Sequence, residues 1–348
     1  MKILRIVLLV LLVIVAVVVL GGVYIYNDWT RGVLPQHSGE LSVAGLTDRV
    51  EIIRDDSGIP HIYASNSHDL FFAQGYTQAQ DRWWQMEFFR HVGNGAIQEL
   101  TGQTDSLAST DIFIRTVGWR RSAERDAAAL DEETLGYLQA FSDGVNAYIS
   151  SRAPSDLAFE YNVLGLTRVS FDIQPWTPVD TLVFGKIMAW DLGSNRSDEL
   201  QRAALYETIG QEMTDLYIPP YPYDQRPTMI HEDELPTAEA ASPDQGAEIL
   251  SGDAIDPVMA GNPSLDTSFI FGHGSGIGSN NWVVSGSMTT SGTPLLANDP
   301  HLGIRMPSIW YEIGLHCQPV GADCPFNVVG FGFPASAGVI IGHNDKIA

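Results

Sequence analysis

An unbroken apolar run near the N-terminus constrains the fold of this chain more than any other feature. The run covers Ile6–Tyr26 and contains no charged residue, and a helix of about 20 apolar residues spans the core of a bilayer. A core helix of a soluble protein usually carries a polar face, which this run lacks. Lys2 and Arg5 precede it, so the basic end is predicted to stay in the cytoplasm while the rest of the chain is exported.

Two fates of this segment remain open. No A-x-A-like cleavage site follows it, so we expect an uncleaved signal-anchor at residues 1–26 and a linker at 27–48. A removed signal peptide is the alternative. In either case the protein is expected in the periplasm or another extracytoplasmic space, and an uncleaved helix would also anchor it in the cytoplasmic membrane.

The charge of the chain argues against a nucleic-acid partner. It has 19 Lys and Arg residues against 42 Asp and Glu residues, which gives a net charge of −23 at pH 7. Nucleic-acid phosphates are bound by Lys and Arg side chains, which are scarce here. A large net charge of this sign is otherwise a property of soluble proteins.

The two cysteines, Cys317 and Cys324, lie close together in the sequence. In an exported protein such a pair is expected to form a disulfide that closes a short loop. A metal-binding pair is the alternative, but His316 alone does not complete a ligand set.

The rest of the chain divides into three regions. Residues 49–218 begin with a predicted hairpin and continue with helical periodicity, whereas residues 219–278 are acidic, contain many prolines and lack periodicity, as is typical of an exposed spacer. Residues 279–348 contain short apolar runs that predict antiparallel strands. The expected strands are 50–54, 59–64, 282–285, 294–297, 309–315, 326–331 and 339–342, and the expected helices start at Ser67–Asp69, near 121, at Pro178 and at Asp198, with a short turn at 96–100.

Ser279 follows a glycine-rich run at 272–278 and precedes a strand-like run. If the bond between Gly278 and Ser279 is cut, Ser279 becomes an N-terminal residue that combines a nucleophile and a base. Its hydroxyl attacks a carbonyl, and its α-amine, with an unperturbed pKa of about 8, accepts the proton. A Gly-Ser-Asn pattern in a loop is most often just a turn, so the catalytic interpretation needs further support.

Other catalytic motifs are missing from the sequence. It contains no Gly-x-Ser-x-Gly elbow of the α/β-hydrolase type. His231-Glu232 lacks the second histidine of an H-E-x-x-H zinc site, and the glycine run at 272–278 fits neither the P-loop nor the dinucleotide-binding pattern.

Several segments together resemble the penicillin acylase family of N-terminal-nucleophile hydrolases. Ser279–Val284 is similar to the start of the family's β-chain, and the resemblance extends from about residue 50 to residue 348. The other segments that resemble family motifs are Arg54-Asp55, Gly58–Ala64, Gln74–Tyr76, Ala79–Arg82, Gln85–Glu87, Leu296–His301 and Gly342–Asn344.

The resemblance implies an α+β fold of the αββα type, in which two antiparallel sheets pack face to face between helices. It also implies a precursor that is cut at Gly278–Ser279. Residues 49–218 would form the α-chain, 219–278 the spacer and 279–348 the start of the β-chain, with the two chains remaining partners. The implied reaction is hydrolysis of a linear amide through an acyl-enzyme on Ser279. A penicillin or cephalosporin side chain or an N-acyl homoserine lactone would be the small-molecule substrate, and no organic cofactor is implied.

The resemblance assigns roles to two further polar residues. His301 matches a position that contacts and orients the nucleophile in some family members, and the alternative is a surface histidine after Pro300. Glu199 matches a glutamate that binds a structural calcium ion (Ca2+) in the family. A carboxylate near a helix start is otherwise an ordinary capping residue.

Four apolar residues match positions of the family's acyl-binding pocket, although each is also a plausible core residue. They are Met188, Leu192, Leu302 and Ile341. The last two positions are phenylalanine in penicillin G acylases, so the resemblance leaves room for aliphatic acyl groups.

The resemblance places further functional groups of the family, including its oxyanion donors, beyond Ala348. We therefore expect this chain to be a fragment that does not catalyse alone, because losing one oxyanion donor costs roughly 10²–10³ in kcat. The leading hypothesis is an exported acylase precursor. The alternative is a non-catalytic, acylase-like envelope protein with a binding or scaffold role.

Overall fold

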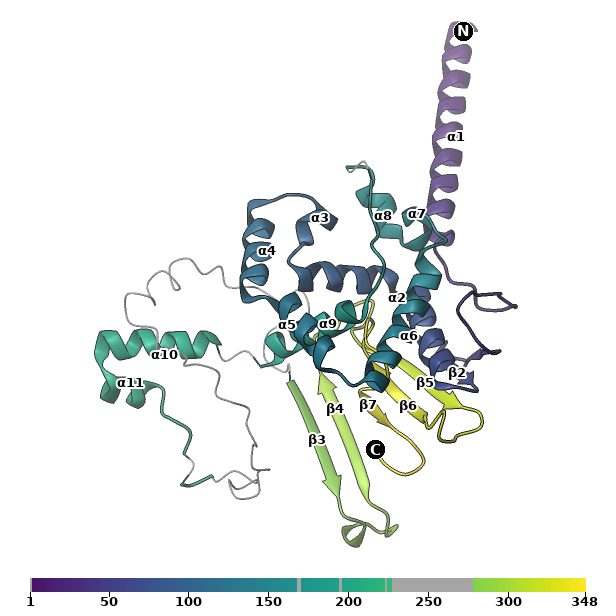
Figure 1. Cartoon of the computed structure of the whole chain (residues 1–348). Coiled ribbons are helices and arrows are strands. Elements are labelled where there is room, and N and C mark those ends of the chain that lie inside the picture. The colour runs from purple at the N-terminus through teal and green to yellow at the C-terminus, as the bar shows by residue number, and fades with distance from the viewer. Residues whose placement is uncertain (1, 168–169, 194–195, 223, 227–277) are drawn as a thin grey trace. The chain divides into compact units, whose positions relative to one another are not determined.

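The computed structural model describes residues 2–167, 170–193, 196–222, 224–226 and 278–348 (Figure 1). Most of the spacer predicted at 219–278, and all of the glycine-rich run except Gly278, lie outside these residues. The chain forms two units, one of residues 1–188 with 266–348 and one of residues 189–265. Each unit is described by itself.

The N-terminal apolar run forms the helix α1 (Lys2–Arg31), as its composition predicts. Within the described residues, this is the one helix whose length and hydropathy suit a membrane span, and its apolar side chains are exposed. The helix continues past Tyr26 to Arg31, so the first residues of the predicted linker are helical.

The predicted hairpin is confirmed, and it leads into a long helix. Strands β1 (Glu51–Arg54) and β2 (Pro60–Ala64) pair antiparallel. The helix α2 (Ser67–Asn94) follows, and its cap is Asn66 rather than Ser67, because the Asn66 side chain accepts the backbone N–H of Asp69. The helix ends at Gly95 in the left-handed conformation, with φ of 60°.

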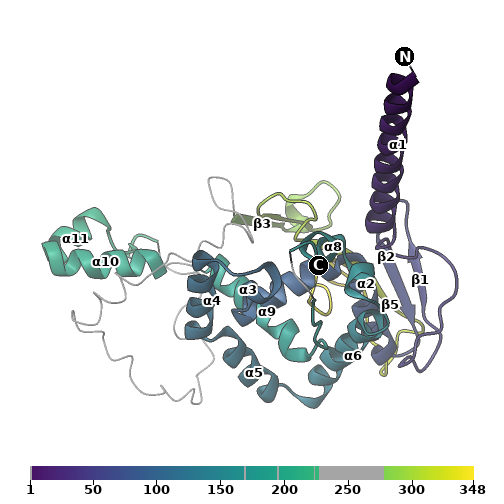
Figure 2. The same ribbon diagram turned by 90° about the horizontal axis from the view of Figure 1, so that it is seen from above.

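The helix α2 packs along α6 (Glu132–Ile149), and the two run side by side in both views (Figures 1 and 2). Their close approach requires a glycine on each helix. A Cβ at Gly75 would collide with the Phe141 carbonyl, and a Cβ at Gly144 with the Phe72 carbonyl. At these two glycines the helix backbones therefore approach each other more closely than a residue with a Cβ would allow.

The remaining helices are short. In the first unit they are α3 (Ile97–Thr101), α4 (Asp105–Val117), α5 (Trp119–Ala129), α7 (Pro154–Leu157) and α8 (Phe159–Leu164). Helix α9 (Pro178–Leu192) reaches the unit boundary, and the second unit contains α10 (Arg196–Ile209) and α11 (Gln211–Tyr217).

Five strands form one sheet in the order β1-β2-β5-β6-β7. Its later members are β5 (Tyr311–Cys317), β6 (Asn327–Gly332) and β7 (Ile341–His343), which pair antiparallel with one another. The pair β2–β5 is parallel, so the expectation of purely antiparallel sheets is wrong at this pair. The helices α2 to α11 lie between these two strands in the sequence and supply the long crossover that a parallel pair needs.

One face of this sheet forms a core with α2. Alternate residues of β5 point inward, and they meet Ile62 of β2 and Leu70 of α2. The predicted disulfide between Cys317 and Cys324 is present and lies in this core. The α+β class is confirmed by this combination of helices and a sheet.

The strands β3 (Gly278–Val284) and β4 (Leu295–His301) form a separate antiparallel pair. Both are longer than the predicted 282–285 and 294–297. A short 3-10 turn at Gly286–Met288 follows β3. This hairpin carries the predicted cut site.

Candidate functional site

Ser279 is the second residue of β3, and β4 lies beside it. In the register of the pair, Gly278 lies opposite His301 and Ser279 lies opposite Pro300. The hairpin therefore brings together the three residues that the sequence predicted for the cut and for the nucleophile. Ser279 is exposed at this position.

The imidazole of His301 has a defined orientation. Its Nδ1 atom lies 3.0 Å from the backbone oxygen of Asp299. A carbonyl can only accept a hydrogen bond, so Nδ1 carries the proton and Nε2 keeps a lone pair when the ring is neutral. The Asp299 carboxylate is also close, with Oδ2 3.6 Å from Nδ1.

The acceptor nitrogen of His301 faces Gly278. A Cβ placed on Gly278 would lie 3.5 Å from Nε2, an ordinary van der Waals distance. Directly opposite residues of an antiparallel pair share one face, and successive residues alternate faces. His301 thus lies on the face of Gly278, while the Ser279 side chain points to the other face.

The predicted pocket residues lie on other elements. Met188 is buried and Leu192 is exposed, four residues apart on α9. Leu302 directly follows β4 and Ile341 starts β7 opposite Phe331, and both are half-buried. The pairing that unites Gly278, Ser279 and His301 does not include α9 or β7, so a joint pocket remains a prediction.

Glu199 lies in the first turn of α10 and is exposed. The described residues contain no group of three or more His, Cys, Asp or Glu side chains that would hold a metal ion. Calcium takes six to eight oxygen ligands, so Glu199 alone does not fit a calcium site, and calcium binding also remains a prediction.

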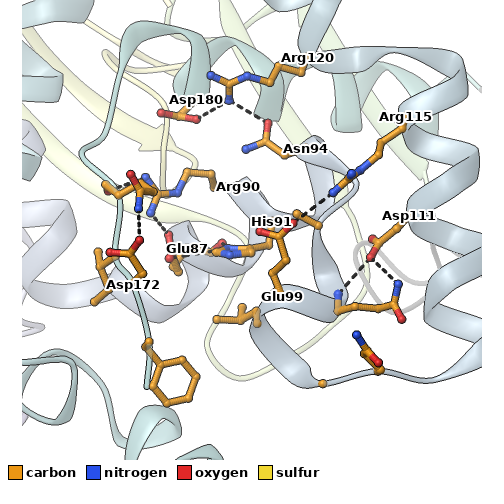
Figure 3. A pocket seen from close by; sticks show the side chains of 18 of the residues that line it. Glu87, Arg90, His91, Asn94, Glu99, Asp111, Arg115, Arg120, Asp172 and Asp180 are labelled. Atoms are coloured by element: carbon orange, nitrogen blue, oxygen red, sulfur yellow. Dashed lines mark hydrogen bonds and ion pairs between the residues drawn. The ribbon is translucent and has the colours of Figure 1, made fainter. Parts of the chain in front are cut away.

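A second feature, which the sequence did not predict, is a polar cavity of about 1350 Å³ beside α2, α3 and α4 (Figure 3). None of the predicted site residues lines it. The motif Gln85–Glu87 is the one sequence signal that points to it, because Glu87 is among its lining residues.

The charged groups of this cavity hold the helices together. Arg90 pairs with the buried Glu87, lies 5.7 Å from the Trp83 ring and 5.4 Å from the Trp176 ring, and donates to the Gln174 carbonyl at 2.8 Å. Figure 3 shows the same arrangement further along the wall, where Asp111 accepts the backbone N–H groups that start α3 and Arg120 pairs with Asp180. These pairs give the charged residues that line the cavity a structural role, because they join the segments around it.

Comparison with known proteins identifies the family of the chain and several relatives. Residues 49–348 match the penicillin amidase family. The chain is 32% identical over 331 residues to penicillin acylase 2 proenzyme from Pseudomonas sp. (strain SE83), covering 91% of this chain and 38% of that protein. It is 28% identical to acyl-homoserine lactone acylase QuiP from Pseudomonas aeruginosa, over 90% of this chain and 34% of that protein.

Two penicillin G acylases are also similar to this chain. The chain is 27% identical to that of Escherichia coli, over 87% of this chain and 38% of that protein. A solved chain of the thermostable enzyme from Alcaligenes faecalis is 26% identical, with a TM-score of 0.42, over 56% of this chain and 97% of the solved one. This chain thus spans less than two fifths of the curated relatives' length, and with its family match over residues 49–348 it belongs to the penicillin amidase family.

Proposed function

We propose that this chain is part of an exported acylase precursor that is cut between Gly278 and Ser279 and then hydrolyses a linear amide through an acyl-enzyme on Ser279. The observation that carries this proposal is the β3–β4 register. It places Ser279 at the start of a strand and an oriented histidine beside Gly278, in a chain of the penicillin amidase family.

The cut itself is a transfer of the Gly278 acyl group. The Ser279 hydroxyl attacks the Gly278 carbonyl carbon, the C–N bond breaks, and the hydroxyl proton passes to the departing amine. The resulting ester between Gly278 and Ser279 is hydrolysed by water, which yields a Gly278 carboxylate and frees the Ser279 hydroxyl. The new α-amine then serves as the base for later acyl transfers.

His301 acts at the Gly278 side of this bond. Its Nε2 lone pair lies beside Gly278, and the hydrogen bond from Nδ1 to the Asp299 carbonyl holds the ring in place. Cleavage removes Gly278 from this position. The space next to Nε2 then becomes available to the new amine of Ser279 or to a substrate, so one histidine serves both the cut and the mature site.

The substrate class follows from the relatives and from the pocket candidates. The named relatives are acylases of penicillins or of acyl-homoserine lactones. Both names describe hydrolysis of an amide that joins an acyl chain to a small ring. Leu302 and Ile341 supply aliphatic surface, which suits an aliphatic acyl chain better than an aromatic one.

Export and anchoring complete the proposal. The apolar helix α1 suits a signal-anchor, and the disulfide suits an oxidising compartment outside the cytoplasm. Glu199 would supply one carboxylate to a calcium ion that is completed by other ligands, and no catalytic step depends on it.

The test is the intact mass of the full chain after expression and purification. We expect two fragments from the unmodified chain and a single uncut chain from Ser279→Ala. Ser287→Ala is the matched control, since Ser287 lies in the exposed turn after β3, and it should be cut normally. Normal cutting of Ser279→Ala would refute the proposal.

A further inference from the structure

Helix α8 carries an exposed apolar stripe. Phe159, Val163 and Leu166 are 40%, 41% and 73% exposed. Their spacing of i, i+4 and i+7 places them on one side of a helix. Leu166 lies just past the helix end, where its N–H donates to the Val163 carbonyl at 3.2 Å, so it continues the same stripe.

The opposite side of α8 packs on the core, and the stripe therefore faces away from the core. Tyr161 is buried and accepts the indole N–H of Trp83 at 3.2 Å. Its ring also packs edge-on against Trp84, with 5.3 Å between the ring centroids. A helix held in this way cannot rotate its apolar stripe into the core.

The stripe begins at the end of the apolar helix α1. The Phe159 ring packs edge-on against Trp29, with 6.5 Å between centroids, and Figure 1 shows α8 beside the end of α1 that enters the domain. Tyr24, Tyr26 and Trp29 are clustered toward this end. Tyr and Trp are enriched where a membrane span meets the aqueous phase.

The length of α1 determines where the contact between Trp29 and Phe159 lies relative to the membrane. Its 30 residues extend about 45 Å at 1.5 Å per residue, and a bilayer with its headgroup regions is about 40–45 Å thick. If the helix spans the bilayer, its length therefore places Trp29, near its C-terminal end, at the membrane surface. A side chain that touches Trp29 lies at the level of the headgroups.

We propose that Phe159, Val163 and Leu166 form a lipid-contact surface that rests in the headgroup region beside α1. This inference rests on α1 being a membrane anchor, as proposed above. All three side chains are apolar, so the contact should form on zwitterionic phosphatidylcholine without anionic lipid.

The experiment places an environment-sensitive fluorophore on single cysteines of the full chain. Both native cysteines are buried in the disulfide, so they do not compete for the label. Labels at Val163→Cys and Leu166→Cys would be compared with one at Met288→Cys, an exposed apolar control in the turn after β3. Each protein is reconstituted in phosphatidylcholine vesicles with and without lipid spin-labelled near the headgroup.

We expect a blue shift and a loss of fluorescence with spin-labelled lipid at residues 163 and 166, and neither change at 288. Flotation of the chain with the vesicles reports separately on the anchor. If the chain floats but the labels at 163 and 166 are not quenched, the lipid contact is refuted while the anchor stands. A blue shift without quenching would mean that protein covers the stripe, which also refutes the contact. A chain that does not float refutes the anchor and the contact together.

Discussion

His301 lies beside Gly278, the residue that precedes the proposed cut, and on the face opposite to the Ser279 side chain. A positioned acid–base group contributes roughly 10²–10⁴ in rate. We therefore expect His301→Ala to slow the appearance of cut fragments by about 10²-fold. The measurement is a time course of intact mass on freshly purified or translated full chain.

His343→Ala is the control for this variant, because His343 is exposed at the end of β7. It should be cut at the normal rate. A His301→Ala chain that is cut as fast as the unmodified chain would show that His301 does not contribute to the cut.

The sequence predicted the identity of these residues but not their geometry. The residues Ser279 and His301 were found through segments that resemble a family. Which face His301 occupies depends on the register of β3 with β4, and a slip by one residue would move its ring to the other face. Register depends on the turn between the strands, which the alternation of apolar residues does not determine.

The environment of Asp69 leads to a prediction about how stability depends on pH. Burial raises the pKa of its carboxyl, but hydrogen bonds from the Thr47 backbone, His68, Asn66 and the Thr47 hydroxyl outweigh burial and lower the pKa to about 2. A carboxyl with a lowered pKa stabilises the fold above its unfolded pKa, near 3.9, and loses this contribution as pH falls toward 2.

We expect Asp69→Asn to lower the free energy of unfolding by about 2 kcal/mol at pH 7, since one pKa unit corresponds to about 1.4 kcal/mol. The loss of stability between pH 4 and pH 2 should also become shallower. The measurement is the urea midpoint in mild detergent across this pH range. Asp131→Asn is the control, because Asp131 is an exposed cap of α6 and Asn caps as well as Asp. Equal effects of the two variants would show that the hydrogen bonds to the Asp69 carboxylate do not stabilise the fold.

At the scale of elements, two glutamines of α2 hold the loop between β6 and β7. Gln78 accepts the Ala335 N–H and donates to the Ser336 carbonyl, both at 3.1 Å. Gln74, one turn earlier, makes the same pair of bonds with Gly338 at 2.9 and 3.0 Å. Both glutamines are fully buried, and Ala335 takes a positive φ of 84° in this loop.

Replacing Gln78 with leucine leaves the buried Ala335 N–H and the half-buried Ser336 carbonyl without their partners. At about 1–3 kcal/mol for each unpaired group, we expect a loss of stability of roughly 2–4 kcal/mol by urea unfolding. Gln139→Leu is the control, because Gln139 is exposed on α6 and its side chain donates to Asp143 one turn on. A Gln78→Leu chain as stable as this control would show that the loop does not depend on α2.

The elements were predicted where a local signal exists and missed where it does not. Alternation located β1, β2 and β5 to within two residues. Helix α4 was missed although Thr104 caps its start and Gly118 ends it, because its apolar stripe is short. The parallel pairing of β2 with β5 was missed because a strand has the same side-chain period in parallel and antiparallel pairs.

At the scale of the whole molecule, the segments on either side of the proposed cut are interleaved. The strand β2 pairs with β5, and Tyr311 donates to Asp81 at 2.6 Å. The Gln318 N–H also donates to the Ala64 carbonyl at 2.8 Å. These contacts do not involve the residues at the cut, so breaking one peptide bond leaves them in place.

We therefore expect the two fragments to stay together after the cut. They should co-elute in size-exclusion chromatography in mild detergent and separate only in denaturant. Fragments that separate without denaturant would mean that the sheet does not hold the two segments, which would contradict the observed strand order.

Self-cleavage before Ser279 is best checked by the N-terminal sequence of the smaller fragment. We expect a fragment that begins Ser-Asn-Asn-Trp-Val and contains residues 279–348, and we expect no such fragment from Ser279→Ala. A fragment that begins at any other residue, or the same fragment from Ser279→Ala, would contradict self-cleavage before Ser279.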